Sequence, residues 1–258
     1  MSMQNTRMSF LGCPLDLSGG EEILRRIEGA ASLAGPRLRI EGLNVAKLVD
    51  ARKDMDLMAA LREAEIVHVD GQGVALGLAA LGIKAERCAG IDLMQQICQR
   101  ASMLGHSIYL LGAREEIVAA VVERLNATLP ALAIAGWRDG YFTEDEEPAV
   151  ADAIAASGAA ILFIGISSPK KELFLRRNWE RLAVPVAMGV GGSFEVVSGR
   201  LPRAPRLMQR SGLEWLFRLC LEPRRLAGRY LRTNAVYAWL LAGAWLKHKV
   251  AAAKPGTR

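Results

Sequence analysis

Short aliphatic and β-branched runs alternate with longer stretches of helical periodicity over the first 199 residues of the chain. An apolar run bounded by turn residues predicts a buried strand, whereas apolar positions three to four residues apart predict a helix. Strands are predicted at residues 10–15, 37–41, 66–69, 107–112, 133–137, 160–165 and 184–189. Helices are predicted at residues 21–32, 72–81, 92–104, 115–126, 146–156 and 170–179. This alternation predicts an α/β fold with a mostly parallel sheet.

The pattern changes near Gly199, after which the strand signals stop. A helical segment is predicted from Pro205 to about Lys249, with breaks at Gly212 and Pro223. Within it, residues 235–246 are twelve apolar residues without a charge. A membrane-spanning helix needs about 20 such residues, so this run is predicted to pack on a core or to lie in an interface. We therefore predict a body at residues 1–199 and a helical appendage at residues 200–258.

Charge divides the chain at the same place. Residues 200–258 hold 13 basic and two acidic residues, a net charge of +11, while residues 1–199 hold 20 basic and 25 acidic residues, a net charge of −5. A basic segment on an acidic body predicts a polyanionic surface as partner. Trp and Tyr residues are interleaved with the basic ones, which is typical of a segment that lies in a membrane interface, although a plain solvated surface would also carry such charges.

The cysteines and the first residues bear on the compartment. Cys13, Cys88, Cys98 and Cys220 show neither a CxxC motif nor regular spacing, and three histidines do not complete a zinc pattern. These cysteines are therefore interpreted as small buried hydrophobic residues. The first twelve residues lack the apolar core of a signal peptide, so we expect a protein of the reducing cytoplasm.

A single carboxylate follows the buried strand in the motif VHVDGQGV, residues 67–74. Ligands of an open α/β sheet bind at the carboxyl ends of its strands, where Asp70 would serve as a general base. Asp is also a favoured residue at helix N-termini, so Asp70 could instead cap the helix that follows.

Glycine-rich turns follow three other predicted strands. In GVGGSFE, residues 189–195, backbone N–H groups could hold a phosphate, although a plain tight turn is an alternative. This turn is neither GxGxxG nor a P-loop. The loops at Gly112 and Gly165 are similar, and three such loops on one sheet edge favour a ligand of nucleotide size. The motif DMD at residues 54–56 is interpreted as a helix start, and we predict neither a metal site nor a cofactor.

The blocks VDGQGV, ERCAGIDL, GWRDGYF, GISSPKKE, GVGGSFEVVSGRLPRAP and GLEWLFRLCLEPRRLAGRYL occur in that order. In order and wording they resemble the WecG/TagA/CpsF family of bacterial glycosyltransferases, from about residue 8 to 240. The resemblance implies a Rossmann-like body with helices on both faces of the sheet, and a helical basic appendage. It implies an inverting, metal-independent transfer of a hexose-type sugar from a UDP-sugar to a polyprenyl (undecaprenyl)-diphosphate-linked saccharide. Such enzymes act on the inner face of the cytoplasmic membrane and build cell-surface polysaccharides.

The resemblance, taken together with the strand-end loops and the basic appendage, assigns candidate site residues. Asp70 matches the proposed base, with Asn44, Arg87, Asp92 and Lys171 beside it. The nucleotide pocket is assigned to Gly112, Tyr141, Gly165, Gly189, Gly191, Gly192 and Glu195. Diphosphate or membrane contacts are assigned to the arginines Arg203, Arg206, Arg218, Arg224, Arg225, Arg229 and Arg232, three of which (225, 229 and 232) would share one helix face.

The chain departs from the family pattern at three positions. Gly42 stands where Thr is usual, Lys171 where Gln is usual, and Glu195 where Asp is usual. Lys171 could add positive charge for the leaving diphosphate. These departures leave the identity of the sugar open, and they keep a catalytically altered partner subunit as an alternative function.

Other classes of function fit less well. A dinucleotide-dependent oxidoreductase would need a GxGxxG turn, which the chain lacks. The basic appendage would suit nucleic acid, but no RNP, KH or paired zinc signature supports that partner. The expected partners are therefore the UDP-sugar, the polyprenyl-linked acceptor and an anionic membrane surface, with a homo-oligomer left open.

Overall fold

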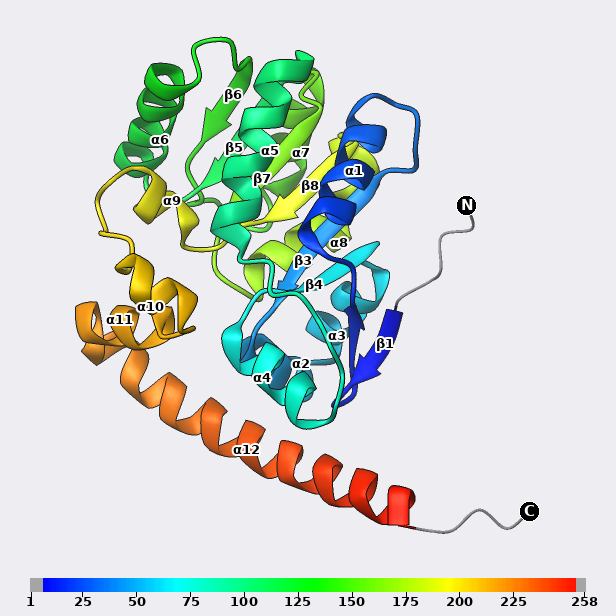
Figure 1. Cartoon of the computed structure of the whole chain (residues 1–258). Helices are drawn as coiled ribbons and strands as arrows, with labels where there is room; N and C mark the ends of the chain where they lie inside the picture. The colour runs from blue at the N-terminus through cyan, green and yellow to red at the C-terminus, as the bar shows by residue number, and fades with distance from the viewer. Residues whose placement is uncertain (1–6, 254–258) are drawn as a thin grey trace.

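A six-stranded parallel sheet forms the centre of the computed structural model, which describes residues 7–253 (Figure 1). Its strands follow the order β4-β3-β8-β7-β5-β6, and every neighbouring pair is parallel. All six carboxyl ends therefore lie on one edge. The strands are β3 (Leu38–Leu43), β4 (Ile66–Val69), β5 (Ile108–Gly112), β6 (Ile134–Arg138), β7 (Ile161–Gly165) and β8 (Val186–Gly189).

Helices cover both faces of this sheet, because alternate strand residues point to opposite faces and both sets are apolar. One face packs against α1 (Gly20–Ala31), α5 (Gly90–Leu104), α6 (Glu115–Thr128) and α9 (Ser193–Val197). The other packs against α2 (Val45–Ala51), α3 (Met55–Glu63), α4 (Gln72–Ala80), α7 (Glu147–Ala156) and α8 (Lys170–Leu182). The predicted α/β, Rossmann-like fold is confirmed.

The N-terminal strand prediction is wrong. Residues 10–15 are not one strand of the parallel sheet, because the chain turns at Leu11 and Gly12 between β1 (Arg7–Phe10) and β2 (Cys13–Asp16). These two strands form a separate antiparallel hairpin. Asp16 ties the hairpin to the sheet, since its carboxylate accepts the N–H of Val67 at 2.7 Å and pairs with Arg7 at 2.7 Å.

Two further differences concern the first βα unit. Strand β3 continues to Leu43, two residues beyond its predicted end, and the seven-residue helix α2 that follows was not predicted. Asn44 caps α2, because its side-chain oxygen accepts the N–H of Lys47 at 3.0 Å. The DMD motif begins α3 as predicted, with the Asp54 carboxylate accepting the N–H groups of Asp56 and Leu57.

The C-terminal appendage is helical in its described part, with α10 (Arg206–Arg210), α11 (Glu214–Leu221) and α12 (Pro223–Ala253). The breaks at Gly212 and Pro223 are confirmed; Gly212 has a φ of +73°, which glycine adopts without strain. Helix α12 packs mainly on α2 and runs along the lower side of the body in Figure 1. Buried Leu226, Thr233 and Tyr237 face the body, and the Tyr237 hydroxyl donates to the Gly73 carbonyl at 2.8 Å.

Within residues 7–253, no helix combines the length and the apolar character needed to cross a bilayer. Three cysteines, Cys13, Cys88 and Cys98, are buried as predicted, but Cys220 on α11 is exposed. The predicted boundary between body and appendage at residue 199 stays a prediction.

Candidate active site

The residues assigned from the sequence gather at the carboxyl edge of the sheet. Asn44, Asp70, Gly112, Gly165 and Gly189 come from the ends of five different strands, so the parallel topology alone brings them to one edge. Helices α10 and α11 of the appendage lie beside this edge (Figure 1).

Asp70 does not cap the helix that follows it. The N-cap position of α4 is Gly71, and no side chain caps that end. Instead, Oδ1 of Asp70 accepts the N–H of Gly90 at 2.8 Å, at the start of α5. This bond fixes the carboxylate between two segments, while its second oxygen forms no hydrogen bond within the described chain. A carboxylate with one oxygen held and the other free has the arrangement that a general base requires.

The position of Asp70 depends on Gly42. A Cβ atom at residue 42 would lie 2.8 Å from Asp70 Cβ, closer than such atoms approach, and 3.1 Å from His68 Cε1. Asn44 packs equally closely against Gly71, the residue after Asp70, since a Cβ atom at Gly71 would lie 2.8 Å from Asn44 Cβ. The departure at Gly42 therefore gives the Asp70 side chain the space that it occupies on β3.

Arg87 and Asp92 contact the appendage. The guanidinium of Arg87 pairs with Glu214 on α11, and its Nε donates to the carbonyl oxygen of Asp70 at 3.1 Å. Asp92 pairs with Arg203, which precedes α10. Two ion pairs of opposite polarity thus join the body to the appendage next to Asp70.

The strand-end glycines divide into two kinds. A Cβ atom at Gly112 would lie 2.5 Å from the Gly165 carbonyl carbon, and one at Gly165 would lie 2.5 Å from the Phe194 ring. These two glycines therefore serve close packing. By contrast, nothing lies within 4 Å of a Cβ atom at Gly191, and only Glu195 and Arg218 approach Gly192, at 3.5 and 3.7 Å. The turn at residues 190–192 is the open one.

Glu195 and Arg218 flank this open turn. Oε2 of Glu195 is buried and has no hydrogen-bond partner among residues 7–253. The Arg218 guanidinium comes from α11 and is exposed. Because β3 separates β4 from β8, the turn lies two strand spacings from Asp70, about 10 Å. That separation leaves room for a reacting carbon between them, with an attacking group on the side of Asp70 and a leaving phosphate on the side of the turn.

Tyr141 lies on the loop after β6 and is 72% exposed. Lys170 holds this loop by donating to the Phe142 carbonyl at 2.6 Å. The neighbouring Gly140 packs on the strand end, since its Cβ would lie 3.1 Å from Gly112 Cα. The structure therefore places Tyr141 beside the Gly112 and Gly165 ends, with its ring in solvent.

Lys171 belongs to a buried cluster of four charges. Its ammonium lies 2.5 Å from Glu41 and pairs with Glu172, while Lys47 lies 2.7 Å from Glu41 and 2.8 Å from Glu172. Burial alone would lower the pKa of Lys47, but Glu172 and Glu41 raise it above its ordinary value. Burial would raise the pKa of Glu172, but Lys171 and Lys47 hold it below its ordinary value. We call these four residues the ionic quartet.

The ionic quartet lies directly beneath the end of β8. A Cβ atom at Gly189 would be 2.7 Å from the Lys171 Nζ atom. The positive charge that Lys171 carries is thus matched by two carboxylates in the core. Glu41 and Lys47 were not assigned from the sequence, although the acid in the apolar stretch RIEGL was a visible signal, since a buried carboxylate needs a cationic partner.

The remaining arginines spread over the appendage. Arg232 pairs with Asp50 at 3.2 Å, while Arg206, Arg224 and Arg229 are exposed, and the side chain of Arg225 lies outside the described part. Of the predicted diphosphate contacts, the structure brings Arg203 and Arg218 to the carboxyl edge. Glu214 was not assigned from the sequence, because an acid in a first helical turn has an ordinary explanation in the helix dipole.

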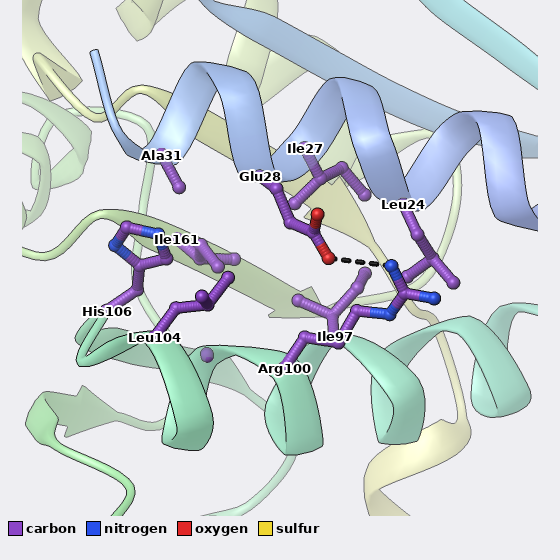
Figure 2. Close-up of a pocket in the computed structure, with 10 residues that line it drawn as sticks. Leu24, Ile27, Glu28, Ala31, Ile97, Arg100, Leu104, His106 and Ile161 are labelled. Carbon is purple, nitrogen blue, oxygen red and sulfur yellow. Dashed lines mark hydrogen bonds and ion pairs between the residues drawn. The ribbon is translucent and has the colours of Figure 1, made fainter. Parts of the chain in front are cut away.

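A separate cavity of about 10 Å³ lies between α1 and α5 (Figure 2). Its lining includes Ile161 and His106, which mark the amino ends of β7 and β5, so it lies at the opposite edge from Asp70. Arg100 and Glu28 bridge it with an ion pair of 2.7 Å. The cavity is a gap between two helices and holds none of the assigned residues.

Potential metal ligands do not converge in the described structure: among residues 7–253, no three His, Cys, Asp or Glu side chains form a group that could hold a metal ion. Asp56 of the DMD motif pairs with Arg176 at 3.0 Å instead.

The features of this site come from segments along the whole chain. They are the parallel strands, the carboxylate after β4, the open glycine turn and the basic appendage. The model of the glycosyl transferase WecG/TagA/CpsF family matches residues 8–251. This match covers the body and nearly all of the appendage. The chain is therefore a member of the WecG/TagA/CpsF family of glycosyltransferases.

Proposed function

We propose that this glycosyltransferase moves a hexose-type sugar from a UDP-sugar to a polyprenyl-diphosphate-linked saccharide, with inversion at the anomeric carbon. Family membership indicates a glycosyltransferase of cell-surface polysaccharide synthesis. The observation that carries the finer proposal is the Asp70 carboxylate, which has one oxygen held by Gly90 and the other free, two strands from the open turn at Gly191 and Gly192.

The reaction is a single displacement. The free oxygen of Asp70 takes the proton from the acceptor hydroxyl as its oxygen forms a bond to the anomeric carbon. The bond between that carbon and the diphosphate oxygen breaks, and UDP leaves with the electron pair. Because the new bond forms opposite the one that breaks, the configuration inverts. Proton transfer by a positioned side chain typically contributes about 10²–10⁴-fold to the rate.

The leaving diphosphate would lie at the open turn. The backbone N–H groups of Gly191 and Gly192 and the Arg218 guanidinium would face its oxygens, while the N–H of Val190 donates to the Ile164 carbonyl at 2.9 Å. Guanidinium groups pair with phosphate through two parallel hydrogen bonds. Fixed donors of this kind stabilise the charge that develops on the leaving group. We propose that these groups suffice without a metal ion, and turnover that persists in excess chelator would support this.

Substitution of Asp70 by Asn tests the mechanism. The amide keeps the shape and can still accept the Gly90 N–H, but it cannot take a proton. We expect turnover to fall by about 10²-fold or more, with UDP binding by calorimetry unchanged. Near-wild-type turnover in Asp70→Asn would remove Asp70 from the mechanism. UDP binding by the wild-type protein without turnover of any UDP-sugar would favour the alternative, a partner subunit without activity.

We propose that the protein works in the cytoplasm, bound to the inner face of the membrane through the appendage. Helix α12 supports this, since Trp239 is 75% exposed and Leu231 78% exposed among basic residues. Aromatic and basic side chains on one helix are typical of interfacial binding.

A further inference from the structure

Arg87 lies between the appendage and the candidate base. One end of its guanidinium pairs with Glu214 of α11, and a second nitrogen lies 3.5 Å from the Gln209 carbonyl of α10. Its Nε donates to the carbonyl oxygen of Asp70 at 3.1 Å. The side chains of Arg87 and Glu214 are 21% and 20% exposed, so the pair is largely shielded from solvent. One side chain therefore joins the appendage to the strand end that carries Asp70.

The same short segment holds Asp70 a second time. Residues 87–92 comprise the end of the loop before α5 and the first turn of that helix, and the N–H of Gly90 donates to Asp70 Oδ1 at 2.8 Å. Asp92, at the end of this segment, pairs with Arg203 of the appendage. Residues 87–92 thus contact the appendage on one side, through Arg87 and Asp92, and Asp70 on the other, through Arg87 and Gly90.

We propose that residues 87–92 transmit docking of the appendage to Asp70, and that Glu214 is the positioning residue that starts this coupling. The inference rests on the proposed function only in making Asp70 the base. When Glu214 docks, it fixes the guanidinium of Arg87, and Arg87 fixes the Asp70 carbonyl. Gly90 is then held where its N–H meets Oδ1 of Asp70. Glu214 itself touches no reacting atom.

The physical argument concerns what Arg87 does without Glu214. A guanidinium has five donors and no acceptor, so an Arg that loses its carboxylate turns toward water or another acceptor. Its remaining bond to the Asp70 carbonyl is a single bond to a neutral oxygen. The pair with Glu214 joins two opposite charges, and guanidinium–carboxylate pairs are among the strong hydrogen bonds of proteins. Loss of Glu214 therefore frees the guanidinium of Arg87 and weakens its hold on the Asp70 carbonyl. Cys88 still donates to the Val69 carbonyl at 2.8 Å, so the segment stays on β4, but the Gly90 N–H and Oδ1 of Asp70 are held together less firmly.

The alternative is that Glu214 and Arg87 are a plain tether. In both cases docking of the appendage depends on the ion pair between Arg87 and Glu214. The two cases differ in what is restored when the charges of the two residues are exchanged. In Arg87→Glu with Glu214→Arg, the opposite charges still attract across the interface. A glutamate at residue 87, however, has no side-chain donor for the Asp70 carbonyl. The double variant therefore separates docking from its effect on Asp70.

The experiment uses the full-length protein and three readouts. Docking is measured as protection of the arginine-rich residues 199–234 from trypsin. The state of Asp70 is measured as the exchange rate of the Gly90 amide, and kcat and KM for the UDP-sugar are measured where turnover occurs. Glu28→Gln is the control, since it breaks an Arg–Glu pair of similar exposure between α1 and α5, away from the carboxyl edge, and leaves Arg100 paired with Glu21.

We expect Glu214→Gln to speed Gly90 exchange and to lower kcat by about tenfold or more, with KM for the donor little changed, because a charged hydrogen bond is lost but the open turn is not touched. Glu28→Gln should leave both unchanged. The double variant Arg87→Glu with Glu214→Arg should recover the protection from trypsin that is lost when the pair is broken, while Gly90 exchange stays fast and kcat stays low.

Two results would overturn the proposal. One is recovery of kcat and of slow Gly90 exchange in the double variant, which would make the pair a plain tether. The other is wild-type exchange and kcat in Glu214→Gln. If the wild-type protein transfers no sugar but Gly90 exchange responds as described, the proposed function fails and the coupling stands.

Discussion

Asp70 lies over strand β3 because residue 42 has no side chain. The two strands are paired in register, with Gly42 opposite His68, so an added atom at residue 42 meets the side chains of His68 and Asp70 on the same face. A Thr at this position would require Asp70 to move.

We expect Gly42→Ala to destabilise the protein by about 1–3 kcal/mol, since overpacking a paired strand forces neighbours to shift. It should also lower kcat, because the shift falls on Asp70. Gly29→Ala is the control: nothing lies within 4 Å of its Cβ and it is in a helix, so it should stabilise by about 0.5–1 kcal/mol. Urea unfolding and kcat decide this, and wild-type stability and kcat in Gly42→Ala would contradict the described packing.

His68 is fully buried behind Asp70, and burial lowers its pKa below the ordinary value of 6.5. The charges of Asp70 and Glu41 oppose this effect without reversing it. In the unfolded chain His68 therefore takes up a proton near pH 6.5, whereas in the folded protein it does so only at a lower pH. Stability rises with pH where the unfolded state binds more protons, so His68 lowers stability as the pH falls below about 6.5.

This dependence is measurable between pH 5 and 6.5, above the range where carboxylates titrate. The free energy of unfolding should fall by up to about 1.4 kcal/mol per pH unit in this window. A His68→Met variant removes the titrating group and should give a flatter profile over the same window. An equally steep profile in His68→Met would assign the pH dependence of stability to other groups. His106 is not fully buried, and His106→Asn is the control variant.

Among the elements, β3, α2 and α8 are joined by the ionic quartet. Its side chains are at most 6% exposed, and two positive charges match two negative ones. Breaking a buried pair by removing one partner typically costs about 3–5 kcal/mol, because a charge is left uncompensated. The quartet therefore joins α8 to α2 and to β3 next to the strand end that carries Gly189.

We expect Lys171→Gln to destabilise the protein by about 3 kcal/mol, since two carboxylates then face Lys47 alone. Adding Glu41→Gln should recover most of that loss, because one pair, Lys47 with Glu172, remains balanced. Thermal unfolding of both single variants and the double variant gives the coupling. Effects that simply add would contradict the quartet. The double variant also tests Lys171 as a contact of the leaving diphosphate, which requires a lower kcat even when stability is recovered.

The elements that could be predicted are those with an apolar run bounded by turn residues, or with apolar positions at helical spacing over several turns. Strands β4, β5, β7 and β8 carry the first pattern, and helices α1, α4, α5, α6, α7 and α8 the second. The hairpin β1–β2 could not be predicted, because its turn at residues 11 and 12 carries none of the dipeptides that mark tight turns. Helix α2 was missed because seven residues give too few turns for a period to show.

The candidate site divides in the same way. Strand topology brings Asp70 and the glycines to one edge, so their grouping could be inferred from the sequence alone. Which glycine is open could not, since Gly112 and Gly165 differ from Gly191 only in what packs on them. The partners of Arg87, Asp92 and Lys171 come from segments up to 130 positions away, and no local pattern contains them.

For the whole molecule, the separation of charge places the basic surface on the appendage. The body carries −5 and residues 200–258 carry +11. Helix α12 packs on α2 through its buried face, while Leu231, Trp239, Trp245 and Leu246 are exposed along the helix, with the Lys249 ammonium 5.0 Å from the centre of the Trp245 ring. Near an anionic leaflet each basic residue contributes about 1 kcal/mol, and the aromatic residues add burial at the interface.

We expect the full-length protein to bind vesicles that contain phosphatidylglycerol and not to bind vesicles of phosphatidylcholine alone. Raising the salt from 0.15 to 1 M shortens the screening length from about 8 to about 3 Å, so binding should weaken strongly. Trp239→Ala should lower the affinity for anionic vesicles at low salt, because an exposed ring of the outer face is lost. Trp137→Ala is the matched control, since that ring is 39% exposed on β6 of the acidic body. If both variants bind the vesicles equally, or if binding does not depend on lipid charge, the membrane contact lies elsewhere on the protein. The net charge of +11 on the appendage would then serve diphosphate binding alone.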